Sequence, residues 1–400
     1  MRWRAAVAMS QILTRVTDRP WRSVASVVVA LTALVTACGT SQSGSSTSGT
    51  SSTSTYAIAH ARTIAEQYLS ARTTYQGPTS SPPIRPGVRV AIISCSQVTT
   101  GCHRPTEAAV AAAQTIGWNA TVFDGQGQPS IQLQAVETAV SQHYDAIILM
   151  LVDPNNVAAG LQAAHAAHIA VVTLGEPAYT TSRASTWGWI PDVSHDWLQS
   201  GVALAEYMVW KSNGKVNALM MDGADTIVVQ DGQFKGSYQV LSSKKLCPDC
   251  MVSVQKFTVA TLTTVPAQEA QSAVEGNPNL NWLWCYDFCL YQAITKLQAA
   301  GLTRPNLQAA GFDCNAENLN LMKNGVVQSV CAADARDWEA WATVDEANRL
   351  LSGQRPVAEN PPFRLVDRST ISQLTAQDLA DGWQGGYDFR SEFKKIWGVS

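Results

Sequence analysis

The chain has 400 residues, of which 46% are hydrophobic and 15% are charged, and its formal net charge is −3. At about 100–200 residues per domain, this length predicts two domains. A negative net charge argues against nucleic acid and against an anionic membrane surface as partners.

The N-terminal segment predicts export. An apolar run over residues 24–37 follows five arginines and ends at Cys38. The run is shorter than the roughly 20 residues that cross a bilayer, so we expect residues 1–37 to be a signal peptide. Small residues before Cys38 are similar to the lipobox of bacterial lipoproteins, which predicts lipidation of Cys38; an ordinary cleavage site is the alternative. Removing residues 1–37 changes the formal charge from −3 to −7.

Residues 38–86 are expected to form a tether and a spacer helix. Glycine, serine and threonine dominate residues 39–55, a composition typical of flexible linkers. Apolar residues then recur at helical spacing, which predicts one amphipathic helix over residues 56–75. This helix either acts as a spacer or packs against a domain, and the sequence leaves both open.

Short apolar runs alternate with helical segments from residue 88 onward. The first block contains VRVAIIS (88–94), ATVFD (120–124), DAIILML (145–151) and IAVVTLG (169–175). After a helix at 194–210, the second block contains KVNALMMDG (215–223), MVSVQKF (251–257), NWLWCYD (281–287), LQAAGFD (307–313) and VVQSVCAAD (326–334). Such runs are typical of buried parallel strands. The two blocks predict an α/β fold of two Rossmann-like, doubly wound parallel-sheet lobes with a ligand cleft between them.

Candidate binding residues follow the predicted strands, because ligands of open α/β sheets bind outside the carboxyl ends of the strands. Their carboxylates, amides and aromatic rings suit a small neutral ligand with many hydroxyls, a sugar or polyol. For any single aspartate, a helix cap or turn is the alternative. The candidate ligand-binding residues are Gln97, Asp153, Glu176, Tyr286, Asp287, Asp313, Asp334, Arg336 and Trp338.

Four stretches carry a family resemblance. They are VRVAIIS, DAIILMLVDPNNVAAGLQAAHAAHIAVVTLG, NLNWLWCYDFCLYQAITKLQAAG and LQAAGFDCNAENLNLMKNG, in this order. Residues 88 to about 365 thereby resemble the periplasmic binding protein type 1 family, the ribose-binding-protein-like sugar receptors of ABC importers. The resemblance implies two lobes joined by a hinge. We assign residues 87–190 and 333–366 to the N-terminal lobe, and residues 191–332 and 367–400 to the C-terminal lobe.

The same resemblance implies roles for residues and partners. Asp313 would bind sugar hydroxyls, and Tyr286 beside Asp287 would contact the ligand. The segment DARDWEAWATVDEANRLLSGQRP resembles a branch of exported receptors in which Trp338 would cap the ligand. The implied partners are an ABC permease and its cytosolic ATPase, served by a monomer in the periplasm or cell envelope whose only membrane contact is a lipid anchor.

Three positions depart from the family pattern. Gly175 and Glu176 stand where the family has an Asp-Arg pair, and Ala332 replaces a glutamine. The family's arginine in the loop after MMDGAD has no match in TIVVQDGQF. A pentose ligand is therefore not implied.

The cysteines predict disulfides. Of the nine cysteines, eight remain when Cys38 is set aside, and an even number in an exported chain is typical of disulfide-bonded proteins. The sequence does not fix the connectivity. The CPDC motif could be a redox motif or half a zinc site, but we expect it to form a structural loop. His165 and His168 could bind a metal, but we expect them to lie on an exposed helix face. The disulfide candidates, which fall in near pairs, are Cys95, Cys102, Cys247, Cys250, Cys285, Cys289, Cys314 and Cys331.

The favoured function is a lipid-tethered receptor that captures a small ligand and delivers it to an ABC permease. One alternative is a sensor subunit that presents ligand to a signalling receptor, and another is the same receptor fold with a non-carbohydrate ligand. An exported enzyme would use Asp153, Asp287 or Asp313 as acid and base. We expect no enzyme and no cofactor, because the HExxH, GxSxG, phosphate-loop and dinucleotide motifs are absent from the sequence.

Overall fold

The computed structural model describes residues 48–70, 74–176, 190–224 and 232–400. The predicted signal peptide, the predicted lipidation site Cys38 and the predicted tether up to residue 47 lie outside these residues. None of the helices in the described ranges is long and apolar enough to cross a membrane.

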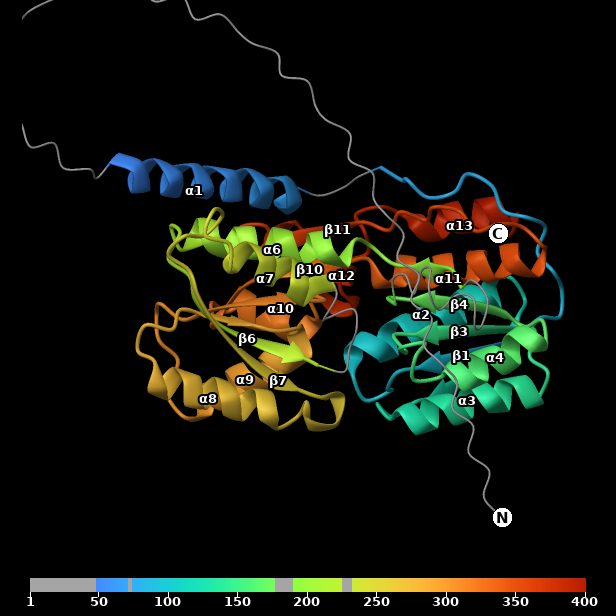
Figure 1. Ribbon diagram of the computed structural model, residues 1–400. Helices are drawn as coiled ribbons and strands as arrows, with labels where there is room; N and C mark the ends of the chain where they lie inside the picture. Colours follow the sequence, from blue (N-terminus) through green and yellow to red (C-terminus); the bar gives the residue numbers. More distant parts are fainter. Residues whose placement is uncertain (1–47, 71–73, 177–189, 225–231) are drawn as a thin grey trace, which may run out of the picture. The chain divides into compact units, whose positions relative to one another are not determined.

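The first sheet has five parallel strands among the described residues, in the order β2-β1-β3-β4-β5. Figure 1 shows β1, β3 and β4 of this sheet side by side. Side chains of β1 alternate between two cores, because successive residues of a strand point to opposite faces. Val90 and Ile92 pack in one core, and Ala91 and Ile93 pack in the other. The strands are β1 (Arg89–Ser94), β2 (Asn119–Asp124), β3 (Ala146–Met150), β4 (Ala170–Leu174) and β5 (Asp192–Val193).

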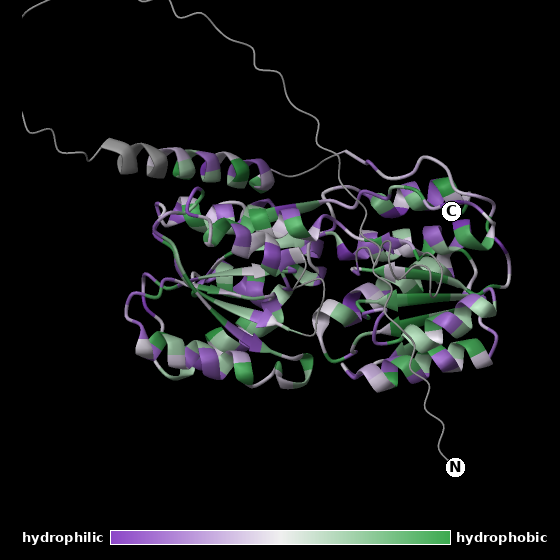
Figure 2. Cartoon of the chain, in the orientation of Figure 1, coloured by the Kyte–Doolittle hydropathy of each residue, from purple (hydrophilic) through white to green (hydrophobic). Residues whose placement is uncertain are grey.

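Helices cover both faces of this sheet, and we call the sheet with these helices the first lobe. Figure 2 shows hydrophobic residues along its strands and hydrophilic residues on the outer sides of its helices. The core of Val90 includes α2 (Thr100–Thr115) and α11 (Arg336–Leu351). The core of Ile93 includes α3 (Pro129–Ser141) and α4 (Ala158–Ala166). A doubly wound lobe is therefore confirmed.

The second sheet has six strands among the described residues, in the order β11-β10-β9-β8-β6-β7, and all pair in parallel except β11. Helices again cover both faces, and together they form the second lobe. The strands are β6 (Asn217–Gly223), β7 (Met251–Phe257), β8 (Trp282–Trp284), β9 (Gln308–Phe312), β10 (Gln328–Asp334) and β11 (Phe363–Asp367). The helices are α6 (Trp197–Lys211), α7 (Lys235–Leu241), α8 (Val265–Gly276), α9 (Asp287–Ala299) and α10 (Ala316–Lys323), with a 3-10 turn η2 (Val259–Thr261).

Two C-terminal segments pack differently from the sequence prediction. β11 was expected within the first lobe, but it pairs antiparallel with β10 at the edge of the second sheet. Residues 367–400 were expected to extend the second lobe. Their helix α13 (Phe389–Trp397) instead buries Phe393 and Trp397 against Trp341 of α11, in the first-lobe core. Aromatic burial thus decides the position of α13. The same stretch contains a 3-10 turn η3 (Ile371–Gln373) and α12 (Ala376–Asp381).

The N-terminal helix α1 covers Ser48–Leu69, so it begins inside the predicted tether and ends before the predicted residue 75. Ala57, Ala61 and Ala65 are buried, and Ala61 and Ala65 belong to the core that contains α6. This row of small residues lets α1 pack closely on α6. Of the two possibilities left open by the sequence, α1 packs against a lobe.

The chain passes between the two lobes at three places. β5 of the first sheet leads into α6 of the second lobe, and β10 of the second sheet leads into α11 of the first. The third connection runs from α11 to β11. Three crossings of this kind predict a hinge, because few residues must change conformation when the lobes move.

The eight predicted cysteines form disulfides, each within its near pair. The pairs are Cys95–Cys102, Cys247–Cys250, Cys285–Cys289 and Cys314–Cys331. The CPDC motif therefore closes its own small loop, as expected. The widest separation, 17 residues, belongs to Cys314–Cys331, which joins the residues after β9 to β10.

We predict that loss of the Cys314–Cys331 disulfide destabilises the protein most. The Cys314→Ala/Cys331→Ala double variant should lose about 3 kcal/mol of unfolding free energy, because this disulfide restricts the longest loop of the unfolded chain. The matched Cys247→Ala/Cys250→Ala variant, whose separation is 3, should lose less. Urea denaturation of both variants measures the difference, and the reverse order would contradict the prediction.

Candidate functional site

A cavity of about 290 Å³ lies between the carboxyl ends of the strands of both sheets. Its size is near the lower end of the range for small-molecule sites. Loops of the two lobes also touch here: a Cβ on Gly127, after β2, would lie 2.7 Å from Cγ1 of Val259, after β7. The lining residues are Cys95, Ser96, Thr99, Gly101, Cys102, Gly127, Pro129, Gln132, Leu151, Asp153, Asn156, Glu176, Trp197, Gln233, Val259, Leu262, Tyr286, Phe288, Asp313 and Arg336.

Five of the nine predicted residues line this cavity. Each follows a different strand, so the topology gathers side chains that are far apart in the sequence. They are Asp153 after β3, Glu176 after β4, Tyr286 after β8, Asp313 after β9 and Arg336 after β10. Gln97, Asp287, Asp334 and Trp338 are not among the lining residues.

Arg336 is the centre of a buried ion network. Its Nη2 donates to Oδ1 of Asp313 at 2.9 Å, and its Nε lies 2.6 Å from Oδ2 of Asp334. Nη1 lies 3.7 Å from Oε2 of Glu339, and the guanidinium sits 4.5 Å from the ring of Trp197. Burial raises the pKa of Asp334 to about 7, although Arg336 opposes the shift. Arg336 thus connects the cavity residue Asp313 to the crossing between β10 and α11.

Glu176 provides a second acidic group on the first-lobe side. Its side chain is buried, and its backbone N–H donates to Oδ1 of Asp192 at 2.8 Å. Burial raises the pKa of Glu176 well above its usual value, and the neighbouring charges of Asp153 and Asp192 add to the effect. Asp192 accepts hydrogen bonds from Thr173 and Ser194, and burial raises its pKa to about 6.

Asp287 lies behind the cavity wall and holds a turn. Its Oδ1 accepts from Nε2 of Gln328, and its Oδ2 accepts from the backbone N–H of Asn315, both at 2.8 Å. Burial raises its pKa, and Asp313 adds to the shift. The carboxyl therefore fixes the turn that carries Asp313. Asp287 thus has the structural turn role that the sequence allowed as the alternative to ligand binding.

Trp338 and Gln97 also lie outside the cavity lining. The ring of Trp338 stacks on Tyr75 at 5.2 Å and on Phe389 at 5.6 Å between centroids, inside the first-lobe core. The predicted capping position is therefore wrong for Trp338, because its face of α11 packs against the C-terminal segment. Oε1 of Gln97 pairs with Nδ1 of His103 at 2.7 Å.

Sequence reasoning missed several lining residues, above all Trp197. It opens α6, four residues after β5, and its indole Nε1 has no hydrogen-bond partner among the described residues. The sequence signal that could have identified Trp197 is a tryptophan just after a strand, where the chain passes from one lobe to the other. α6 packs tightly against the segment just before α7, because a Cβ on Gly201 would lie 2.3 Å from the carbonyl oxygen of Gln233, another missed lining residue.

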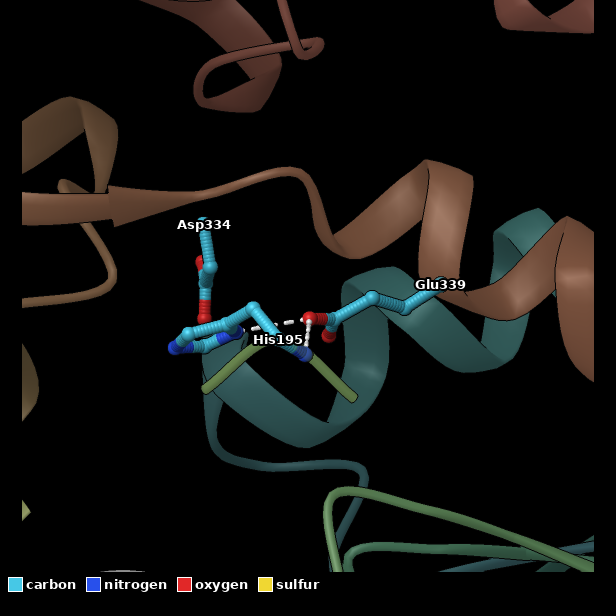
Figure 3. Close-up of side chains that lie close together, drawn as sticks. All are labelled: His195, Asp334 and Glu339. Atoms are coloured by element: carbon cyan, nitrogen blue, oxygen red, sulfur yellow. Dashed lines mark hydrogen bonds and ion pairs between the residues drawn. The ribbon is translucent and has the colours of Figure 1, made fainter. Parts of the chain in front are cut away.

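His195, Asp334 and Glu339 form a compact cluster next to the cavity (Figure 3). Their potential ligand atoms all lie within 4.8 Å of one another, and Nδ1 of His195 lies 2.7 Å from Oε1 of Glu339. The sequence predicted no metal site. Because Arg336 forms ion pairs with both carboxylates, its guanidinium already supplies the positive charge that a metal ion would bring.

A family model described as a periplasmic binding protein domain matches residues 90–355, more than half of the chain. The chain belongs to the periplasmic binding protein family. Membership of this family of solute-binding proteins implies an extracytoplasmic location for the binding protein. No curated protein sequence matches it.

Solved structures share the fold of this binding protein. An ABC sugar transporter subunit from Rhodobacter sphaeroides 2.4.1 has 21% identity and a TM-score of 0.63, with 71% of this chain and 99% of that chain covered. A solute binding protein from Mycobacterium smegmatis with bound glycerol has 21% identity and a TM-score of 0.63, with 73% and 98% covered. One from Agrobacterium vitis with bound allitol has 18% identity and a TM-score of 0.63, with 72% and 97% covered. The two-lobed fold is therefore confirmed.

Proposed function

We propose that this binding protein captures a sugar or polyol in its interlobe cavity and delivers it to an ABC permease. The observation that carries the proposal is the lining of the cavity. Charged and aromatic side chains converge there from strand ends of both sheets, including Asp153, Tyr286, Asp313 and Arg336. Such groups suit a ligand with many hydroxyls, since carboxylates accept and guanidinium groups donate hydrogen bonds.

Each part of the site then has a role. Asp313 would accept hydrogen bonds from ligand hydroxyls, and the free donor Nε1 of Trp197 would complete a bond to a ligand oxygen. The ring of Tyr286 offers a flat apolar surface for the CH groups of a sugar. Glycerol and allitol in the neighbouring structures support a polyhydroxyl ligand.

Ligand capture would proceed by a shift between open and closed states. A ligand that contacts Asp153 of the first lobe and Asp313 of the second favours the closed state by its greater affinity for that state. The three crossings between the lobes would act as the hinge. The closed form would dock as a monomer on the permease, which a cytosolic ATPase drives, and lipidation at Cys38 would hold the receptor near it.

The proposal is tested by a thermal-shift screen of the chain without its signal peptide and lipid. The screen includes sugars, sugar alcohols, nucleosides, amino acids and aromatic acids. A true ligand at about a hundred times its Kd should add ~2.7 kcal/mol to the free energy of unfolding. Stabilisation by a carbohydrate alone supports the proposal, and stabilisation by another class alone contradicts it. Recovery of the ligand unchanged after long incubation supports binding without catalysis.

A further inference from the structure

The first-lobe side of the cavity holds carboxyl groups that have no cationic partner among the described residues. Asp153 and Glu176 follow the neighbouring strands β3 and β4, and both line the cavity. Glu176 is only 2% exposed, and its Oε2 has no hydrogen-bond partner among the described residues. Oδ1 of Asp153 accepts from the backbone N–H and the side-chain Nδ2 of Asn155. Among the described residues, no lysine, arginine or histidine forms an ion pair with Asp153.

The positively charged side chain that lines the cavity already forms ion pairs within the protein. Arg336 is the one lysine or arginine among the described lining residues, and it pairs with Asp313. Behind the wall, the same guanidinium also contacts Asp334 and Glu339. It therefore has no unmatched charge to offer Asp153 or Glu176.

Asp192 adds a third carboxyl group on the same side. It accepts a hydrogen bond from the backbone of Glu176, and its charge opposes ionisation of that carboxyl. A buried carboxylate without a cation is costly, because burial removes its hydration without replacing it. An ammonium group placed between Asp153 and Glu176 would favour the ionised form of Glu176 and would donate a hydrogen bond to its Oε2.

We propose that the ligand carries a positively charged amino group, which Glu176 and Asp153 bind together. The ligand class is then an amino sugar or an amino polyol, with its hydroxyls held by Asp313 and its ring or chain against Tyr286 and Trp197. This inference rests on the proposed function, because it takes the cavity to be the binding site.

Titration calorimetry tests the inference on the chain without residues 1–37, with probes in pairs that differ by one amino group. The amino probes are D-glucosamine, D-galactosamine, D-mannosamine and D-glucamine, and their neutral partners are D-glucose, D-galactose, D-mannose and sorbitol. At least one amino probe should bind about tenfold or more tightly than its neutral partner, as expected for a hydrogen-bonded charge pair. Glu176→Gln should remove this preference, so that amino probe and neutral partner bind with similar affinity. Glu137→Gln, at an exposed position of α3, should preserve the preference.

The outcomes separate this inference from the proposed function. If neutral sugars bind as tightly as their amino partners, or if Glu176→Gln leaves the preference intact, the inference is wrong and the sugar-binding function stands. If neither member of any pair binds while a compound outside the carbohydrates does, both are wrong. If no probe binds at all, the result counts against the amino-ligand inference.

Discussion

Asp313→Asn should weaken ligand binding by a factor on the order of 30, or about 2 kcal/mol, because it removes a charged hydrogen-bond partner. Asp313 lies at the end of β9, lines the cavity and accepts a hydrogen bond from Arg336. Its φ of 81° lies in the left-handed region, which Asn tolerates better than most residues. Asn is therefore a better test than Ala, which would add backbone strain to the loss of the carboxylate.

Calorimetric titration of the ligand found by thermal shift measures this effect. Glu317→Gln is the matched control, because it also removes one carboxylate but lies exposed on α10, four residues further along. The control should bind like the unmodified protein. Equal affinities for Asp313→Asn and the unmodified protein would remove Asp313 from the site.

Arg336→Gln should cost about 3–5 kcal/mol of unfolding free energy, because removal of one partner leaves buried charges unpaired. The guanidinium contacts Asp313, Asp334 and Glu339, and the side chain of Arg336 is 5% exposed. The carboxyl pKa of Asp334 is raised to about 7, above its unfolded value. Protonation therefore favours the folded state, so the deficit should be largest above this pH and should shrink as the pH falls through it.

Urea denaturation across this pH range measures the deficit. Arg62→Gln provides the control, since Arg62 forms an exposed ion pair with Glu66 within α1 and should cost under about 1 kcal/mol. A deficit for Arg336→Gln no larger than that of the control would show that the buried network does not stabilise the fold.

The sequence predicted the strand cores well, because buried parallel strands appear as continuous apolar runs. The runs beginning at residues 88 and 145 correspond to β1 and β3. Polar residues after these strands were found for the same reason, since parallel strands bring their carboxyl ends to one edge. Asp153 and Asp313 therefore line one cavity although 160 positions separate their numbers.

Long-range packing could not be predicted in the same way. The two-residue strand β5 is too short to give a clear pattern. The antiparallel pairing of the edge strand β11 with β10 depends on contacts that no local sequence pattern reports. α13 packs on α11 through aromatic rings that are remote in sequence. The two tryptophans Trp197 and Trp338 both follow strand ends, but only the direction of each helix face decides which one meets the cavity. Trp197 does, and Trp338 enters the core.

The central claim is that the interlobe cavity binds a carbohydrate. Its most direct test is a crystal structure of the chain without residues 1–37, in complex with the carbohydrate that stabilises it most. We expect electron density for that molecule in the interlobe cavity, within hydrogen-bond distance of Asp313 and Arg336 and in contact with residues of both lobes. A carbohydrate bound elsewhere on the protein, with the cavity holding only water, would contradict the account.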